Sequence, residues 1–419
     1  MNQTLTQEGT RTNAGEGMAD VGRLAPLGGL VGVGCLIACG VFFTMSPEYR
    51  LAVAGSWMFG WYFWLTITMG MFSLSILNHA IRPTWTVSLL RQFESGGGPL
   101  AITVMGVLFL PIALMPQNVY EWANPDRVAH DAILQHKEAY LNHTFWLLRF
   151  AIYFLIWIAY SAYMKSSVKR QEAMGDREAG RKLEMGRSSW GAFGIVMFFL
   201  TYTFGVIDWL MSLQAHWSST MFGLWQIVAS ALGAMSFAVF VACVNAKKNP
   251  YTEIMSPNLT KDWGNILFML TMLWAYTAIS QFLIIWNGNL PDTALYYARR
   301  TRQLWNAMGM VTIVGQFLVP WMTLLSPRVK RYPRLLAQMA GWIFCIHIVD
   351  VYLAVGPDIP SKLPVGTTYR AMGDNIWFDV LAFFAVGGIW LYVYASQVAK
   401  RSLIVSYDHR LQEALTHAH

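Results

Sequence analysis

Residues Val206 to Gly223 read VIDWLMSLQAHWSSTMFG, and the fold can be worked outward from this stretch. A long apolar run ends here and carries an aspartate, Asp208, close to its end. A short polar turn follows, and apolar sequence begins again at Met221. Because lipid accepts only backbone whose polar groups are paired, this pattern predicts two membrane helices joined by a short turn. A carboxylate in such a helix needs a physical explanation.

The composition of the whole chain is that of a polytopic membrane protein. Of its 419 residues, 55% are hydrophobic and 13% are charged, whereas a soluble domain has about 25% charged residues. Since about 20 apolar residues cross a bilayer, the sequence predicts an all-α integral membrane protein with about ten transmembrane helices. Their expected limits are 25–45, 50–78, 98–116, 141–164, 189–213, 219–245, 263–287, 303–326, 335–355 and 375–398.

Lysine and arginine are distributed unevenly between the connections. With both termini on one side, 21 of the 30 cations fall on that side and 8 on the other. Positive residues mark the cytoplasmic side, so we expect cytoplasmic tails at 1–24 and 399–419. The segment 165–187 mixes both charge signs with helix formers and predicts a solvated cytoplasmic helix. The longest outer connection, 117–143, either caps the outer face, docks a partner or is an ordinary surface loop.

Two short patterns recur in the same order along the chain. Residues 56–61 read SWMFGW and residues 219–224 read STMFGL. Three helices later in each case, residues 207–210 read IDWL and residues 349–352 read VDVY. In both later patterns the aspartate stands about five residues from the expected outer end of its span.

The agreement in order and depth predicts two four-helix bundles, spans two to five and spans six to nine. Spans two and six run in the same direction, so the repeat is parallel and its axis lies along the membrane normal. Spans one and ten are two peripheral helices outside the repeat. The expected divisions after the N-terminal tail are therefore span one at 25–48, the bundles at 49–213 and 214–356, and the outer loop with span ten at 357–398.

Ionisable residues inside the spans are candidates for function, because each costs roughly 2.5 to 3.5 kcal/mol to insert. With the orientation above, every one of them lies in the outer half of the membrane. The inner halves of the spans are almost free of charge. The candidates are Arg149, Asp208, His347, Asp350 and Asp379, with His143 and Asp374 at the starts of spans.

Helical geometry gives these residues expected depths and partners. At a rise of 1.5 Å per residue, Asp208 and Asp350 lie about 7 Å below their helix ends, and Arg149 and His347 about 12 Å. His347 and Asp350 are three residues apart and can form a hydrogen-bonded pair. Arg149 is expected to pair with one or both aspartates. Two alternatives stay open: an ion pair that only fixes helix packing, and for Asp379 a role at a helix N-terminus.

Uncharged polar residues in the spans permit two interpretations. They either hold water between the outer carboxylates and deeper sites or hydrogen-bond neighbouring helices together. These residues are Tyr202, Thr203, Ser212, Gln226, Thr277, Ser280 and Gln281. No histidine or cysteine set has the spacing of a haem, iron-sulfur or zinc site. We therefore expect no metal or redox centre in this chain, and no nucleic acid partner.

Four motifs stand in order along the chain. They are NHTFWLLR at 142–149, DWLMSL at 208–213 with HWSSTMFG at 216–223, SQFLIIW at 280–286 with NLP at 289–291, and HIVDVY at 347–352 with Pro357. Together they resemble the ActF membrane proteins of bacterial alternative complex III, a family that is similar to the NrfD-like membrane subunits of quinol-linked enzymes. The resemblance covers spans two to ten. One departure is Asp292, where the family pattern has glutamate.

The resemblance implies a respiratory or photosynthetic complex in the bacterial inner (cytoplasmic) membrane that oxidises menaquinol or ubiquinol on the periplasmic side. Iron-sulfur clusters and haem c are then expected on partner subunits, and a quinone is a possible ligand of this chain. The implied partners are a second, longer ten-span NrfD-like subunit, an iron-sulfur subunit, multihaem and monohaem cytochrome c subunits, and small membrane subunits.

On this interpretation, Asp208, Asp350 and His347 relay protons in the outer half of the membrane, with Arg149 as their electrostatic partner. His143 and Asp379 are further relay candidates. Two other functions remain open from the sequence. One is a proton-coupled secondary transporter, for which Pro320 is the best candidate for a helix break. The other is a purely structural anchor for peripheral redox proteins.

Overall fold

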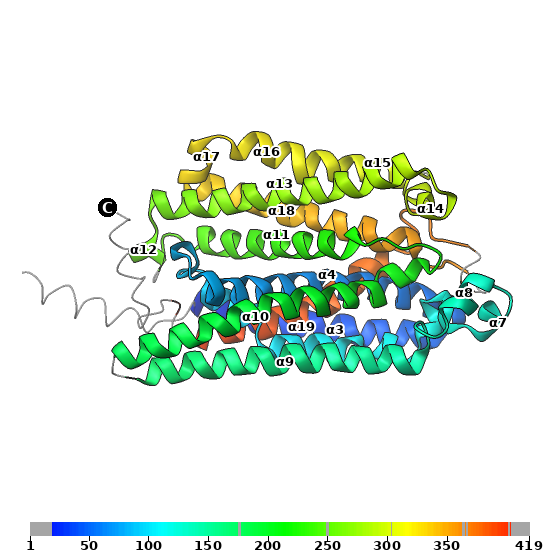
Figure 1. Ribbon diagram of the computed structural model, residues 1–419, viewed down its shortest axis with the longest axis horizontal. Coiled ribbons are helices and arrows are strands. Elements are labelled where there is room, and N and C mark those ends of the chain that lie inside the picture. The colour runs from blue at the N-terminus through cyan, green and yellow to red at the C-terminus, as the bar shows by residue number, and fades with distance from the viewer. Residues whose placement is uncertain are drawn as a thin grey trace, which may run out of the picture.

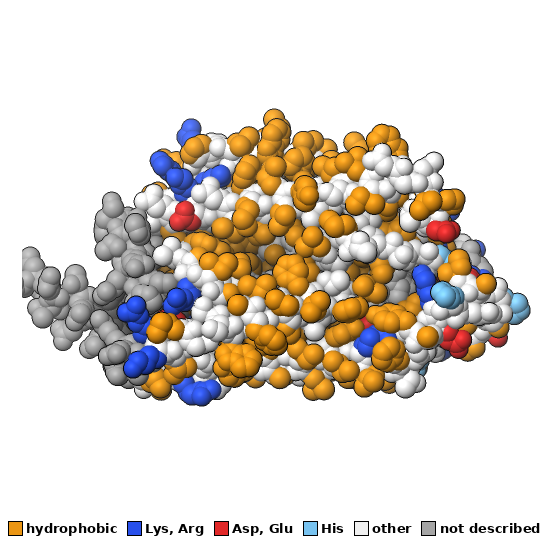
Figure 2. Space-filling model, viewed as in Figure 1, with side chains coloured by type: hydrophobic (Ala, Val, Ile, Leu, Met, Phe, Trp, Pro, Cys, Tyr) orange, Lys and Arg blue, Asp and Glu red, His pale blue; other side chains and the backbone are white. Residues whose placement is uncertain are grey.

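A computed structural model of the chain describes residues 19–174, 177–248, 251–302, 304–362, 365, 368–400 and 403. Within these residues every named element is a helix, and ten helical stretches are long and apolar enough to cross a membrane. The prediction of an all-α multi-span membrane protein is confirmed. Hydrophobic side chains cover the middle of the visible face, while charged side chains gather towards its two ends (Figure 2).

The first bundle is a ring of four long helices. They are α4 (Pro47–Ile81), α6 (Pro99–Leu114), α9 (His143–Ala173) and α10 (Arg177–Trp209). Helix α4 contacts α6 and α10, and α9 closes the ring by contacting the same two helices. Helix α4 is buried along most of its length, because it also contacts the second bundle and the peripheral pair.

The second bundle repeats this arrangement with α11 (Met221–Val244), α13 (Pro257–Gly288), a composite eighth span and α18 (Pro333–Val355). The eighth span consists of α15 (Trp305–Thr312), η5 (Ile313–Leu318) and α16 (Val319–Leu324). Segment η5 is a π-helix. It ends two residues before Pro320, whose missing N–H prevents a regular α-helical bond in this part of the span. Helix α11 packs against α4 and joins the two bundles.

Two peripheral helices, α3 (Leu24–Met45) and α19 (Ile376–Lys400), pack closely against each other and against α4. Glycines permit their close approach. A Cβ atom at Gly32 would lie 2.6 Å from the backbone nitrogen of Ile389 and 2.8 Å from the carbonyl carbon of Gly388. Real Cβ atoms do not come this close to backbone, so these two helices require a residue without a side chain at this crossing.

The two ends of the molecule differ in their connections (Figure 1). We call the end at which α3 begins and α19 ends the tail end, and the opposite end the loop end. Short helices lie at both. The short helices at the loop end are η2 (Pro116–Asn118), η3 (Glu121–Ala123), α7 (Pro125–Ala129), α8 (Ala132–Lys137), η4 (Met211–Gln214), α14 (Pro291–Arg300) and η6 (Gly356–Asp358). Those at the tail end are α2 (Ala19–Gly22), η1 (Thr84–Thr86), α5 (Leu90–Gly96), α12 (Tyr251–Ile254) and α17 (Pro327–Arg331).

The structure differs from the expected spans in two places at the tail end. No separate helix forms in 165–187, because α9 continues to Ala173 and α10 already begins at Arg177. The third span is also preceded by α5, and all seven residues of α5 are buried. The expected limits of the spans, 50–78 and 98–116, leave these residues in a connection. Its burial depends on α4 and α19, which both contact it.

Candidate functional site

Each bundle carries one buried carboxylate towards the loop end. Asp208 lies on α10 and is fully buried, while Asp350 lies on α18 and is 7% exposed. Asp350 precedes the last residue of α18, Val355, by five positions, as expected. Asp208 does not match this spacing, because α10 ends at Trp209 and the chain continues into η4.

In the first bundle, Asp208 is fully paired with Arg149. The Arg149 Nε donates to Asp208 Oδ2 at 2.8 Å, and Nη2 donates to Oδ1 at 2.8 Å. The Tyr153 hydroxyl donates a third bond to Oδ2 at 3.0 Å. A bidentate arginine–carboxylate pair is among the strongest and most directional polar contacts in proteins. Both carboxylate oxygens of Asp208 are therefore already occupied.

The remaining contacts of Arg149 fix its guanidinium in place. Its Nη1 donates to the backbone carbonyl of Tyr140 at 3.0 Å. Its Cζ lies 3.9 Å from the ring centre of Tyr140 and 4.4 Å from that of Phe145. Aromatic faces attract cations, and more strongly where water is excluded. Arg149, like Asp208, is thus held from several sides.

In the second bundle, Asp350 has no comparable partner. The indole of Trp274 donates to Asp350 Oδ2 at 3.2 Å, and no lysine or arginine in the described part of the chain pairs with this carboxylate. Of the two expected alternatives, pairing of Arg149 with one aspartate or with both, the structure therefore shows pairing with Asp208 alone. Helix α9, which carries Arg149, belongs to the other bundle, and Arg149 is already occupied by Asp208.

His347 lies beside Asp350 without bonding to it. Its Nδ1 is 4.0 Å from Asp350 Oδ2, which is too long for a hydrogen bond, so the expected hydrogen-bonded pair does not form. The other ring nitrogen, Nε2, is 2.9 Å from the hydroxyl of Thr66 on α4. His347 therefore links the two bundles, and its Nδ1 has no partner among the described residues.

Two further buried polar residues lie on elements that contact α18, and neither was expected from the sequence. Thr271 stands one turn from Trp274 on α13, and Gln316 lies in the π-helix η5. Both are fully buried. The Thr271 hydroxyl and both amide atoms of Gln316 lack hydrogen-bond partners in the described part of the structure. The sequence signal for Gln316 was a glutamine within an apolar run shortly before Pro320.

Asp379 lies in the first turn of α19, as expected, and is also the centre of a buried network. It accepts hydrogen bonds from Ser56 at 2.7 Å and from the hydroxyl of Tyr352 at 3.1 Å, and it forms an ion pair with Arg370. Arg370 was expected in an outer connection. The network joins α4, α18 and α19, so its geometry indicates helix packing as the role of Asp379.

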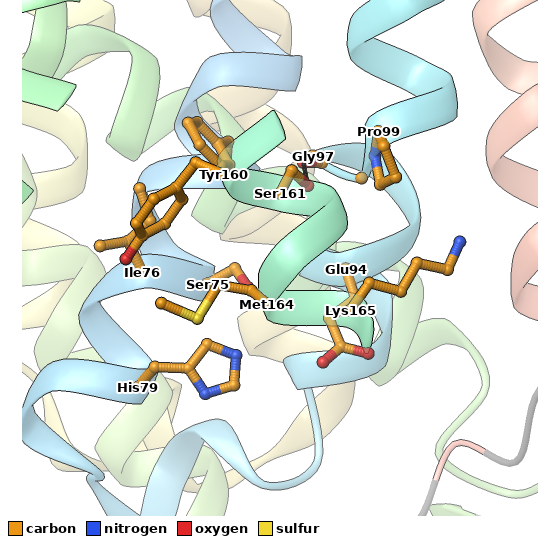
Figure 3. A pocket seen from close by; sticks show the side chains of 12 residues that line it. Ser75, Ile76, His79, Glu94, Gly97, Pro99, Tyr160, Ser161, Met164 and Lys165 are labelled. Carbon is orange, nitrogen blue, oxygen red and sulfur yellow. Dashed lines mark hydrogen bonds between the residues drawn. The ribbon is translucent and has the colours of Figure 1, made fainter. Parts of the chain in front are cut away.

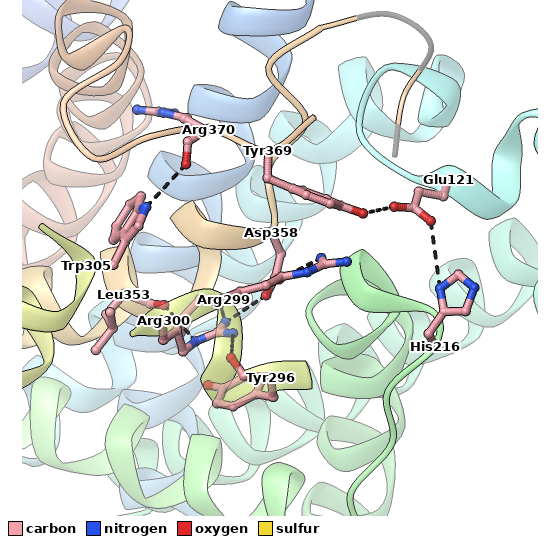
Figure 4. Close-up of polar contacts among 11 residues, drawn as sticks. Glu121, His216, Tyr296, Arg299, Arg300, Trp305, Leu353, Asp358, Tyr369 and Arg370 are labelled. Carbon is pink, nitrogen blue, oxygen red and sulfur yellow. Dashed lines mark hydrogen bonds and ion pairs between the residues drawn. The ribbon is translucent and has the colours of Figure 1, made fainter. Parts of the chain in front are cut away.

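The loop end carries a second ionic network (Figure 4). Arg299 and Arg300 of α14 donate to the two carboxylate oxygens of Asp358, at 3.0 and 2.7 Å. Burial alone would lower the pKa of Arg300, but the charge of Asp358 and the neighbouring Tyr296 outweigh it and raise this pKa above its ordinary value. These contacts attach α14 to the end of α18.

The outer connection 117–143 is attached to the same surface through side chains. Glu121 accepts a hydrogen bond from Tyr369, and His216 lies between Glu121 and Asp131 (Figure 4 shows the first two contacts). The His216 Nε2 is 2.7 Å from Asp131 Oδ2. Asp131 also caps α8 by accepting from the amides of Ile133 and Leu134. The connection therefore caps the loop end.

Most of the uncharged polar residues that could have held a water path bond to other helices or to the backbone of their own helix. Tyr202 bonds to Ser230 at 2.9 Å, Gln226 accepts from Tyr62 at 3.1 Å, and Gln281 accepts from Ser219 at 2.6 Å. Ser212 donates to the backbone carbonyl of Asp208, and Thr277 donates to those of Leu273 and Trp274. A ring nitrogen of His143 lies 2.9 Å from the carbonyl oxygen of Ala113. Thr203 and Ser280 are half-buried. This pattern favours helix–helix adhesion over a water path for these residues.

The tail end also carries a buried charged cluster, which lies outside the expected limits of the spans. Arg91 of α5 donates to Glu94 at 2.7 Å and pairs with Glu172 of α9. Beside it lies a small cavity of about 20 Å³, lined by His79, Glu94, Lys165 and other residues of α4, α5 and α9 (Figure 3). This volume holds about one water molecule. The cluster was not foreseen from the sequence because the residues of α5 were expected in a connection.

The described residues contain no group of three or more His, Cys, Asp or Glu side chains that could hold a metal ion. No model of a known protein family matches the chain, and no curated protein matches it either.

Proposed function

We propose that this protein is a membrane subunit of a quinol-oxidising electron-transfer complex, of the kind that ActF represents in bacterial alternative complex III. The support is the four motifs in order, together with the ten-span architecture in which they lie. On this proposal the tail end faces the cytoplasm, and menaquinol or ubiquinol is oxidised towards the loop end. Iron-sulfur and cytochrome c subunits take the electrons.

The observation that carries a role for this chain is the unequal pairing of its two carboxylates. Oxidation of one quinol releases two electrons and two protons, and a group that exchanges protons must be able to change its charge. Asp208 is bound on both oxygens by Arg149, so a change in its charge would break a buried ion pair, which costs about 3 to 5 kcal/mol. A change in the charge of Asp350 would affect only one side-chain hydrogen bond, the one it accepts from the indole of Trp274.

Asp350 and His347 are therefore the proposed proton-exchanging pair. They lie about 7 and 12 Å from the loop end of α18 at 1.5 Å per residue. Their separation of 4.0 Å is too long for a direct bond, but one side-chain rotation or one water molecule closes it. Arg149 and Asp208 hold the first bundle in shape, and the ionic network around Asp358 fixes the surface above.

The first experiment is purification in mild detergent through a tag on this chain. Visible spectroscopy and mass spectrometry of the accompanying subunits then test the assembly. We expect haem c absorbance, an iron-sulfur subunit and a second ten-span protein. A colourless single protein would exclude the electron-transfer complex.

The second experiment compares Asp350→Asn with Asp374→Asn in the intact assembly. Asp374 is exposed at the same end and accepts only a local backbone hydrogen bond from Ala371, so it controls for loss of one negative charge. We expect Asp350→Asn to slow proton release into the medium, measured with a pH dye during quinol oxidation in liposomes, while Asp374→Asn leaves it unchanged. Equal rates in both variants would exclude Asp350 as a proton carrier.

A proton-coupled transporter is the second candidate, and one observation favours it. The π-helix at Ile313–Leu318 interrupts the eighth span in mid-membrane, and interrupted helices are common at transporter sites. The same purification distinguishes the two functions, since a transporter is expected to be isolated without haem-bearing subunits.

A further inference from the structure

An open groove lies along α9 at the tail end, next to the first turn of α6. Its volume is about 450 Å³, and its walls include Pro99, Ala162, Lys165, Ser166, Lys169 and Arg170. The α9 residues follow a spacing of three and four, so all of them project from one face of the helix. Three of these six side chains are cations, and no acidic side chain lines the groove.

Two acidic groups of the neighbouring elements belong to other contacts. Glu94 lines the small cavity that shares Pro99 and Lys165 with the groove. Glu172 pairs with Arg91 on the side of α5. Lys165 also donates to Gln397 at 3.2 Å, which places its amine between the groove and α19. The charge in the groove is therefore positive, and an anion is its complementary ligand.

The depth of the groove matches the level of lipid headgroups. Helix α9 begins at His143 near the loop end. At 1.5 Å per residue, Ala162 lies about 28 Å along the helix, Lys165 about 33 Å and Arg170 about 40 Å. The hydrocarbon core of a bilayer is about 30 Å thick. Ala162 thus lies at the edge of the hydrocarbon, and the cations lie just outside it.

The surface on the hydrocarbon side of the groove is apolar and exposed. Leu155 on α9 is 65% exposed, and Leu100 on α6 is 49% exposed. A molecule in this groove would therefore meet cations at one end and apolar side chains at the other. A phospholipid has this polarity, and basic pockets between membrane helices bind anionic headgroups.

We propose that this groove binds one anionic phospholipid of the tail-end leaflet. Its phosphate lies among Lys165, Lys169 and Arg170, and its acyl chains follow α6 and α9. The proposal concerns lipid recognition and holds whichever reaction the protein serves.

The test uses the full chain with its accompanying subunits, in nanodiscs of phosphatidylcholine with a minor fraction of phosphatidylglycerol. Native mass spectrometry during stepwise delipidation counts the lipids that remain bound. The variants are Lys169→Ala with Arg170→Ala, and separately Ala162→Trp, which fills the apolar end without changing charge. The control is Arg328→Ala with Arg334→Ala, which removes two exposed cations from the same end of the second bundle.

We expect the wild-type protein and the control to retain phosphatidylglycerol selectively. The double alanine variant in the groove should lose about twenty-five-fold in selectivity, since each cation near an anionic lipid contributes about fivefold. Ala162→Trp should lose the lipid although its charge is unchanged. Equal retention in the groove variants and the control, or no preference over phosphatidylcholine in the wild type, would overturn the proposal.

Discussion

Removal of either partner of the Arg149–Asp208 pair should destabilise the protein far more than removal of both. Arg149→Met leaves a fully buried carboxylate with only the Tyr153 hydroxyl as a side-chain donor. Asp208→Asn leaves a buried guanidinium without its counter-charge, because the amide keeps only one of the two acceptor oxygens and carries no negative charge. Breaking a buried ion pair from one side costs about 3 to 5 kcal/mol, whereas an uncharged replacement of the pair is often close to neutral.

The double variant Arg149→Met with Asp208→Asn should therefore recover most of the lost stability. Since the two single losses of about 3 to 5 kcal/mol each would add up to about 6 to 10 kcal/mol, we expect a coupling energy of about 5 kcal/mol or more, above the usual range for residues in direct contact. The assay is reversible unfolding in mixed micelles by titration with sodium dodecyl sulfate, followed by tryptophan fluorescence. Arg50→Met is the control, because Arg50 is an exposed arginine at the same end and should change stability by less than about 0.5 kcal/mol.

Additive losses in the double variant would refute this reasoning. Such a result would mean that the two side chains stabilise the fold independently, through the rings of Tyr140 and Phe145 and the hydroxyl of Tyr153. The comparison of the two single variants with the double variant also separates an effect on stability from an effect on proton release. A folded double variant should still release protons during quinol oxidation, because Asp350 and His347 are unchanged.

Three further predictions concern packing, an unpaired amide and a surface contact. Gly32→Leu should destabilise the α3–α19 pair by about 1 to 3 kcal/mol in the same unfolding assay, while Gly34→Leu, where a Cβ meets nothing within 4 Å, should not. Gln316→Leu should stabilise the protein by about 1 to 2 kcal/mol by removing an unpaired buried amide, whereas Gln281→Leu should destabilise it by leaving the Ser219 hydroxyl unbonded. Burial pushes the pKa of Asp131 up, but the amides of α8 and His216 outweigh it and hold this pKa below its ordinary value of 3.8. The stability from Asp131 is thus complete above that value and is lost as the pH falls through the lowered one. The protection of the outer connection from hydrogen exchange, measured relative to the intrinsic exchange rate at each pH, should therefore fall there, and Asp131→Asn should abolish this fall.

The number of spans follows from the sequence because a bilayer requires about 20 apolar residues in succession. The sequence of each segment alone shows whether this requirement is met. The caps at Asn142 and Ser256, which accept from the amides of Phe145 and Leu259, are local as well. The tail-end extensions of α9 and α10 were missed because their charged sequence is equally compatible with a separate helix.

The candidate site could be predicted only in part. A charge inside an apolar run identifies Arg149, Asp208, His347 and Asp350 as unusual, since insertion of each is costly. Which of them meet depends on how each helix is rotated and which helix lies beside it. Asp208 and Arg149 meet because α9 and α10 are neighbours, while Asp350 faces Trp274 on α13.

The sequence by itself determined that this is a multi-span membrane protein and which residues carry charge within its helices, because both depend on hydrophobicity along the chain. Only the tertiary structure decided that one carboxylate is neutralised by arginine and the other is not. It also decided that the short charged helix α5 is buried at the tail end. The physical reason is that the partners of a buried charge come from other helices. Apolar helix faces resemble one another in sequence, so only the packed structure shows which faces meet.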